Sequence, residues 1–386
     1  MLGQMGAMNM QMIARSFLIY KLTGSAAILG VMSLANALPM MFLSLYGGVM
    51  ADRVQKKYIL IVGQAGSALT SVMIAVALTM GYLADDKPSS IWILVVSSLL
   101  QGVIQGFMMP ARQAIISEIV SQDQVMNAVA LNNLGMNVLR IMAPAFAGIL
   151  IDLWGYQVVF YFMTFLYLLA TTLVIVMPLT GTTSIRGRGA FAEMKAGFAY
   201  IRRNPNLLLI LLFTQIAVLF SMPYMNMLPV FAVDILKVGA KGGGVLMMFS
   251  GIGAIVGSLT LASLPDKKRG SMLLFSSLIL GLALIGFSFS HSWGLSVAMI
   301  ILVGLGQTGR MTLSNALLQT YTEEQYIGRV MSVYMMEFGL TSLSVVLAGF
   351  LAEGIGIQWA IGGLAIALVG FTLLVIAFSP RMRKLD

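Results

Sequence analysis

Glu337 is the residue with the clearest capacity for chemistry, because it is the only carboxylate well inside a long apolar run of this chain. Ionising a carboxylate in low dielectric is costly unless a cation lies beside it, and Arg140 and Arg310 are the candidate partners. A buried carboxylate can bind and release a proton, so Glu337 is the leading candidate for proton coupling. A purely structural ion pair is the alternative interpretation.

A polar stripe follows one face of the apolar run between residues 125 and 152. Its members are separated by four, three, four and four residues, which is helical spacing, and they are Asn133, Asn137, Arg140, Pro144 and Gly148. Facing lipid would cost about 2.5 to 3.5 kcal/mol for the arginine alone, so we expect the stripe to face a bundle interior or an aqueous cavity. Pro144 and Gly148 permit bending and close packing, and packing alone is the alternative role.

A second stripe lies in the first apolar run, where Gln4, Met8, Gln11 and Arg15 are separated by four, three and four residues. Gln11 is the residue that we expect to contact a substrate. Arg15 either lines the same cavity or extends toward the outer lipid headgroups.

A short charged turn separates the second and third apolar runs, and it contains Gly48, Asp52, Arg53, Lys56 and Lys57. Gly48 is small enough to let a neighbouring helix approach closely. The carboxylate of Asp52 needs a cation or a helix N-terminus, and the basic residues can meet it or lipid headgroups. Arg112, at the end of the fourth run, can approach Asp52 if those ends meet; otherwise it only sets topology.

These residues must be positioned by membrane-spanning helices. The chain has 386 residues, of which 59% are hydrophobic and 10% charged, and a mean hydropathy of +0.93. A span needs about 20 apolar residues in a helix, which satisfies its own backbone hydrogen bonds. We expect an all-α membrane protein with spans near residues 1 to 20, 27 to 51, 58 to 83, 90 to 110, 125 to 152, 156 to 179, 206 to 231, 242 to 264, 271 to 290, 293 to 318, 326 to 354 and 357 to 379.

Composition excludes several kinds of chemistry. The chain has no cysteine, and its one histidine, His291, lies in a polar break between spans. No His-Glu-x-x-His pattern is present, and the glycines at 242 to 244 lack the following Lys-Ser or Lys-Thr of a phosphate-binding loop. We therefore expect no enzyme activity, no metal and no cofactor.

The basic residues predict the orientation of the chain. Of the 23 Lys and Arg residues, the loops on one side hold 17, whereas the opposite loops hold only Lys21, Lys87, Lys237 and Lys241. Short cytoplasmic loops are enriched in these residues, so both termini are predicted to be cytoplasmic in the inner (plasma) membrane. The net charge of +9 thus indicates lipid headgroups rather than nucleic acid as partner.

The chain also repeats itself. Residues 147 to 152 match residues 348 to 353, and Gly102 and Gly304 match at an offset of 202. Near the start, Gly30 and Gly244 match at an offset of 214. We expect a six-helix half at 1 to 179, a cytoplasmic linker at 180 to 205, with a short amphipathic surface helix or a plain spacer, and a second six-helix half at 206 to 386. The same alignment predicts that the first helix is clipped at its N-terminus.

The charged turn resembles the loop between helices two and three of the major facilitator superfamily. In that family the motif contributes to a latch that governs opening to one side. The Asp52-Arg53 pair is intact, whereas Gln55 stands where the family usually has glycine, so an altered turn is expected. Residues 110 to 120, 127 to 131 and 140 to 148 resemble the branch containing the enterobactin exporter and macrolide-efflux proteins. Ala143-Pro144 matches the Gly-Pro of the family's antiporter motif only in part.

The resemblance implies a twelve-helix fold of two pseudo-symmetric halves with alternating access. We expect a monomeric secondary transporter that exports small drug-like or siderophore-like amphiphiles, by proton antiport. Import, or flipping of a lipid-like amphiphile, is the alternative within transport. A membrane receptor or scaffold is the alternative from another class.

Overall fold

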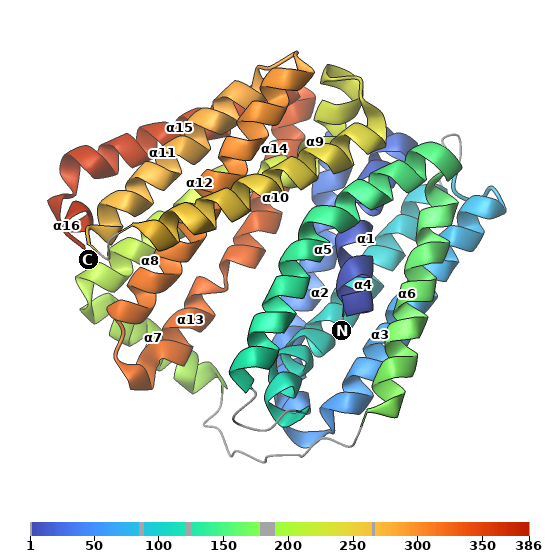
Figure 1. Ribbon diagram of the computed structural model, residues 1–386, viewed down its shortest axis with the longest axis horizontal. Helices are drawn as coiled ribbons and strands as arrows, with labels where there is room; N and C mark the ends of the chain where they lie inside the picture. Colours follow the sequence, from blue (N-terminus) through green and yellow to red (C-terminus); the bar gives the residue numbers. More distant parts are fainter. Residues whose placement is uncertain (1, 85–88, 120–124, 178–189, 265–266, 386) are drawn as a thin grey trace. The chain divides into compact units, whose positions relative to one another are not determined.

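A computed structural model describes residues 2 to 84, 89 to 119, 125 to 177, 190 to 264 and 267 to 385 of the chain. The described residues form helices joined by short turns, and no strand occurs among them (Figure 1). The first seven helices are α1 (Leu2–Thr23), α2 (Ala26–Arg53), α3 (Lys56–Thr79), α4 (Ser89–Ile119), α5 (Val125–Trp154), α6 (Tyr156–Val176) and α7 (Ala190–Arg203). The remaining elements are α8 (Pro205–Ser221), α9 (Pro223–Val230), η1 (Phe231–Ile235), α10 (Gly239–Ser263), α11 (Arg269–Ser288), α12 (Trp293–Thr320), η2 (Glu324–Tyr326), α13 (Ile327–Tyr334), α14 (Glu337–Ile355), α15 (Ile357–Phe378) and α16 (Pro380–Arg383).

Eleven helical segments of the described chain are long and apolar enough to cross a membrane. The first helix, α1, has 22 residues but carries Gln4, Asn9, Gln11 and Arg15, so it is more polar than the others. With α1, the helices agree with the twelve spans predicted from the sequence. The all-α membrane architecture is therefore confirmed.

Contacts divide the chain into two compact units. The first comprises Met1–Arg186 with Lys237–Met248, and the second comprises Gly187–Leu236 with Phe249–Asp386. In the first unit α2 packs on α4, α3 on α6, and α1 on α5 and α6. In the second unit α11 packs on α12 and α15, and α8 packs on α14.

The helix expected in the linker, α7, packs on α13 of the second unit. The rings of Tyr200 and Tyr326 stack with their centroids 4.0 Å apart, and the Tyr200 hydroxyl accepts a hydrogen bond from the backbone N–H of Glu323. This helix therefore contributes to the packing of the second unit.

Two of the spans are interrupted. The seventh changes from α8 to α9 at Met222, where Pro223 has no N–H to continue the hydrogen-bond pattern. The eleventh changes from α13 to α14 at Met335 and Met336, and Glu337 begins the second part. The interruption places the Glu337 carboxylate in the first turn of α14, where a helix dipole favours negative charge.

The internal repeat is visible in the backbone packing. Gly102 of α4 lies against the carbonyl oxygen of Asn36 in α2, and Gly304 of α12 lies in the same way against that of Ser250 in α10. The glycines are 202 residues apart and their partners 214, which are the two offsets found in the sequence. Each unit thus uses one equivalent glycine for close helix packing.

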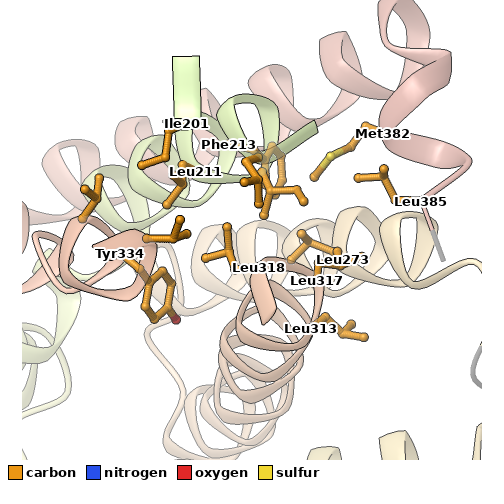
Figure 2. Packing of buried hydrophobic residues seen from close by; sticks show 14 of the residues in the cluster. Ile201, Leu211, Phe213, Leu273, Leu313, Leu317, Leu318, Tyr334, Met382 and Leu385 are labelled. Carbon is orange, nitrogen blue, oxygen red and sulfur yellow. The ribbon is translucent and has the colours of Figure 1, made fainter. Parts of the chain in front are cut away.

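A cluster of buried apolar side chains forms the core of the second unit around α8, α11, α12 and α13 (Figure 2). Phe213, Leu317 and Leu318 are among its fully buried members. Tyr334 lies at the end of this cluster, where its hydroxyl points away from the labelled apolar side chains. The Tyr334 hydroxyl therefore lies at the edge of the apolar core, on the side of the buried Arg310 and Glu337.

Candidate functional site

Arg310 and Glu337 form a buried ion pair inside the second unit. Arg310 projects from α12 and Glu337 from the first turn of α14, and Arg310 Nη1 lies 3.8 Å from Glu337 Oε2. The two residues are 0% and 4% exposed. Of the two partners that the sequence left open for Glu337, the structure places Arg310 beside it.

The polar atoms around this pair have spare hydrogen-bonding capacity. All three guanidinium nitrogens of Arg310, Glu337 Oε2 and the Tyr334 hydroxyl are buried, and none makes a hydrogen bond with the described residues. Buried polar groups are normally paired, and leaving one unpaired costs about 1 to 3 kcal/mol. These atoms can therefore form further hydrogen bonds, and a structural ion pair stays the alternative to proton coupling.

Gln215 of α8 holds the interruption next to this pair. Its side-chain nitrogen donates to the carbonyl oxygens of Val333 and Tyr334, at 3.1 and 3.3 Å. These carbonyls belong to the last turn of α13, where the regular helical hydrogen bonds end, and that of Val333 also accepts from the backbone N–H of Met336 at 3.1 Å. Sequence reasoning missed Gln215 and Tyr334, because nothing in their spacing shows that the eleventh span is interrupted there.

The stripe on α1 faces the interior of the first unit. Gln11 is buried and its Oε1 accepts a hydrogen bond of 3.1 Å from the hydroxyl of Tyr167 in α6. Arg15 donates to Ser98 Oγ and to the carbonyl oxygen of Leu94, both in α4. Arg15 is thus directed toward α4, which agrees with lining the interior rather than extending to the headgroups.

The stripe on α5 has two parts. Pro144 and Gly148 are buried, and a Cβ added at Gly148 would lie 2.5 Å from the carbonyl oxygen of Ala240 in α10. Asn137 and Arg140 are exposed, whereas the side chain of Asn133 lies outside the described residues. The helix-packing role of Gly148 is therefore visible, while the cavity role of the polar residues stays a prediction.

The charged turn joins α2 to α3. No described atom comes within 4 Å of a Cβ built at Gly48, whereas Gly47 lies directly against the carbonyl oxygen of Gly106 in α4. The close approach expected at Gly48 thus occurs one residue earlier. Because successive residues on a helix lie about 100° apart, only Gly47 faces α4.

The basic residues of the turn have different environments. Lys57 donates a hydrogen bond to the carbonyl oxygen of Met177, the residue that ends α6. A cation at a helix C-terminus is favourable, and this partner was not predicted. Arg53 is exposed and Lys56 is buried, whereas the side chain of Asp52 lies outside the described residues, so its predicted partners do too.

Gln55, where the sequence departs from the family pattern, has φ −56° and ψ 122° and directly precedes α3. This backbone conformation is open to any residue, so glycine is not sterically required here. The expectation that the turn differs from that of the family stays a prediction.

Arg112 of α4 is directed into the first unit. It is 9% exposed and its Nη1 donates to the sulfur of Met8 in α1 at 3.3 Å. The side chain of Asp52, its predicted partner, lies outside the described residues, so this contact stays a prediction.

Known proteins share this fold. A solved structure of a mutant of the nucleoside transporter NupG superposes with a TM-score of 0.78 over 96% of each chain, at 12% sequence identity. Two relatives are similar in sequence over most of their length. The staphyloferrin A transporter of Staphylococcus aureus is 24% identical over 94% of this chain and 89% of its own. Macrolide efflux protein A of Streptococcus pyogenes is 23% identical over 96% and 91%.

The fold and these relatives define a membrane transporter of the major facilitator superfamily. A family model described as transmembrane secretion effector matches residues 1–386, and the chain belongs to that family. Membership agrees with the resemblance found in the charged turn and the fifth span.

Proposed function

We propose that this transporter exports small amphiphilic organic molecules, drug-like or siderophore-like, in exchange for protons. The names of the two relatives, a macrolide efflux protein and a siderophore transporter, support export of such compounds. Two six-helix halves that expose a central site alternately to each side are the mechanism that the fold favours. The site then needs a group that binds a proton in one state and releases it in the other.

The observation that carries the proposal is the buried Arg310–Glu337 pair. A carboxylate within the span region is a functional candidate by default, because keeping a charge there is expensive. Arg310 always keeps its proton, so Glu337 is the member of the pair that titrates. Protonation of Glu337 removes the only described counter-charge of Arg310.

Protonation would therefore favour a different arrangement of the second unit. Breaking a buried ion pair by neutralising one partner costs about 3 to 5 kcal/mol, which is enough to reverse a two-state equilibrium. The titratable groups near Glu337 are Arg310 and Tyr334. The interruption between α13 and α14 is the place where we expect the backbone to change conformation when Glu337 is protonated.

The substrate is proposed to contact the polar residues of the first unit. Gln11 and Arg15 face its interior, and we propose that the exposed Asn137 and Arg140 of α5, with Asn133 of the same predicted stripe, add further polar contacts. The charged turn with Asp52 and Arg53 is proposed to control opening rather than to select the substrate. We further propose that the transporter is a monomer in the plasma membrane with both termini in the cytoplasm, since one set of loops holds most Lys and Arg residues.

Proton flux on addition of a substrate tests this function directly. A susceptibility panel in a strain that lacks its own efflux pumps would first identify a substrate, beginning with macrolides. Purified protein is then placed in vesicles that contain the pH indicator pyranine, and that substrate is added outside. Exchange predicts that the lumen becomes more alkaline as substrate enters. Acidification would indicate symport, and an unchanged lumen during substrate entry would exclude proton coupling.

A further inference from the structure

Arg112 is a buried cation whose charge is not balanced by the described part of the first unit. Its guanidinium donates a hydrogen bond to the thioether of Met8, a weak acceptor, and no described carboxylate forms an ion pair with it. In the second unit the cost of burying the Arg310 guanidinium is offset, because its Nη1 lies 3.8 Å from Glu337 Oε2. A buried guanidinium without a counter-charge is unfavourable unless an anion binds to it.

The surroundings of Arg112 can complete an anion site. Gln11 lies three residues after Met8, the partner of Arg112, and therefore on the same face of α1, and its Oε1 accepts a hydrogen bond from the Tyr167 hydroxyl. Because this bond uses the amide oxygen of Gln11, the amide nitrogen is the group that can donate to a ligand. A guanidinium and a nearby amide donor match the planar, two-oxygen geometry of a carboxylate.

The first unit has a second cation of the same kind. Arg15 donates only to the neutral Ser98 and Leu94 of α4. Among the described side chains, Glu337 is the only buried carboxylate, and it belongs to the second unit. The described interior of the first unit is therefore electropositive, which favours an anionic ligand over a cationic one.

We propose that Arg112, assisted by Gln11, binds a carboxylate group of the transported molecule. This inference rests on the proposed transport function and names the chemical class of its substrates as amphiphilic carboxylates. Arg112 is then a substrate-binding residue, in addition to any part that it has in the charged-turn gate. Met8 supplies the adaptable apolar wall beside the bound group.

Binding of matched acid and amide probes tests the proposal without a proton gradient. The full chain is placed in nanodiscs of phosphatidylcholine, and the probes are 1-naphthoate and 1-pyrenebutyrate, each compared with its neutral primary amide by isothermal titration calorimetry. We expect each acid to bind at least tenfold more tightly than its amide. We expect Arg112→Gln to lose this preference, and Arg112→Lys to retain part of it.

The control is Lys21→Gln, which removes an exposed positive charge from the same unit and should keep the preference. Only variants that elute as a single species and remain folded at the assay temperature in a thermal-unfolding scan are compared, and Arg112→Lys serves if Arg112→Gln does not fold. Equal affinity for acid and amide in the unmodified protein, including no binding of either, would overturn the proposal, as would a preference that survives in Arg112→Gln.

Two further results distinguish carboxylate binding at Arg112 from binding of a lipid phosphate and from proton coupling at Glu337. Loss of the acid preference when phosphatidylglycerol is added to the nanodiscs would reassign the site to a lipid phosphate and overturn it. Glu337→Gln should leave the preference unchanged even though proton coupling is lost. A transporter without proton coupling but with an Arg112-dependent acid preference would therefore contradict only the proposed function.

Discussion

At the scale of single residues, the chain contains buried arginines in two different electrostatic situations. Arg310 lies beside Glu337, whereas Arg112 contacts the sulfur of Met8. Burying either guanidinium in low dielectric costs free energy unless a counter-charge lies beside it. For Arg310 the counter-charge is Glu337 of the protein, and for Arg112 we propose that the ligand supplies it. We propose that proton coupling and substrate binding therefore belong to different units.

The two single substitutions in the Arg310–Glu337 pair are expected to lower the free energy of unfolding of the protein by different amounts. Glu337→Gln leaves an arginine that cannot lose its charge, so we expect a loss of about 3 to 5 kcal/mol. Arg310→Gln leaves a carboxylate that can become neutral by binding a proton, so its loss should be smaller. Thermal unfolding in detergent at pH 7 measures both, and the double substitution Arg310→Met with Glu337→Leu should recover stability. A larger loss for Arg310→Gln would contradict this view.

Sequence reasoning identified the right kinds of residue more reliably than their partners. Glu337 stands out because a carboxylate inside an apolar run is rare, and that signal needs no structure. The partners of Lys57 and Arg112, a helix-ending carbonyl and a thioether, come from helices 50 or more residues distant in sequence. Such contacts depend on how helices are rotated against each other, and a spacing pattern within one helix does not contain that information.

At the scale of helices, length and hydropathy were sufficient to predict the spans. The interruptions at Met222 and at Met335–Met336 were not predicted, although Pro223 is a visible signal for the first. The second has no proline, and its carbonyls are satisfied by Gln215 from another helix. A tertiary hydrogen bond thus permits a break that local sequence does not show.

The equivalent glycines Gly102 and Gly304 are expected to be intolerant of a side chain. A Cβ at either position would meet a backbone carbonyl oxygen, which cannot move aside as a side chain can. Overpacking of this kind typically costs about 1 to 3 kcal/mol, so Gly102→Ala and Gly304→Ala should each lower the thermal midpoint. Gly363→Ala and Gly370→Ala are matched controls, because no described atom lies within 4 Å of their Cβ positions. Equal midpoints for all four would show that the close packing is not required.

At the scale of the whole molecule, the two units share one kind of close helix packing but differ in their buried charged residues. Gly102 and Gly304 hold equivalent helix pairs together, while the buried carboxylate occurs only in the second of the described units. A duplicated fold supplies two bundles that can rearrange, and unequal charges give them separate tasks. Export by this family member is therefore proposed to depend on protonation of one unit and ligand binding in the other.

The most direct test of this account measures substrate movement by the Glu337→Gln variant with and without a pH gradient. Vesicles preloaded with unlabelled substrate report exchange for labelled substrate, which needs no net proton movement. We predict that the variant retains exchange but loses accumulation driven by an imposed pH gradient, while Glu353→Gln in the exposed end of the same helix keeps both. Gradient-driven accumulation by Glu337→Gln at the rate of the unmodified protein would contradict the account.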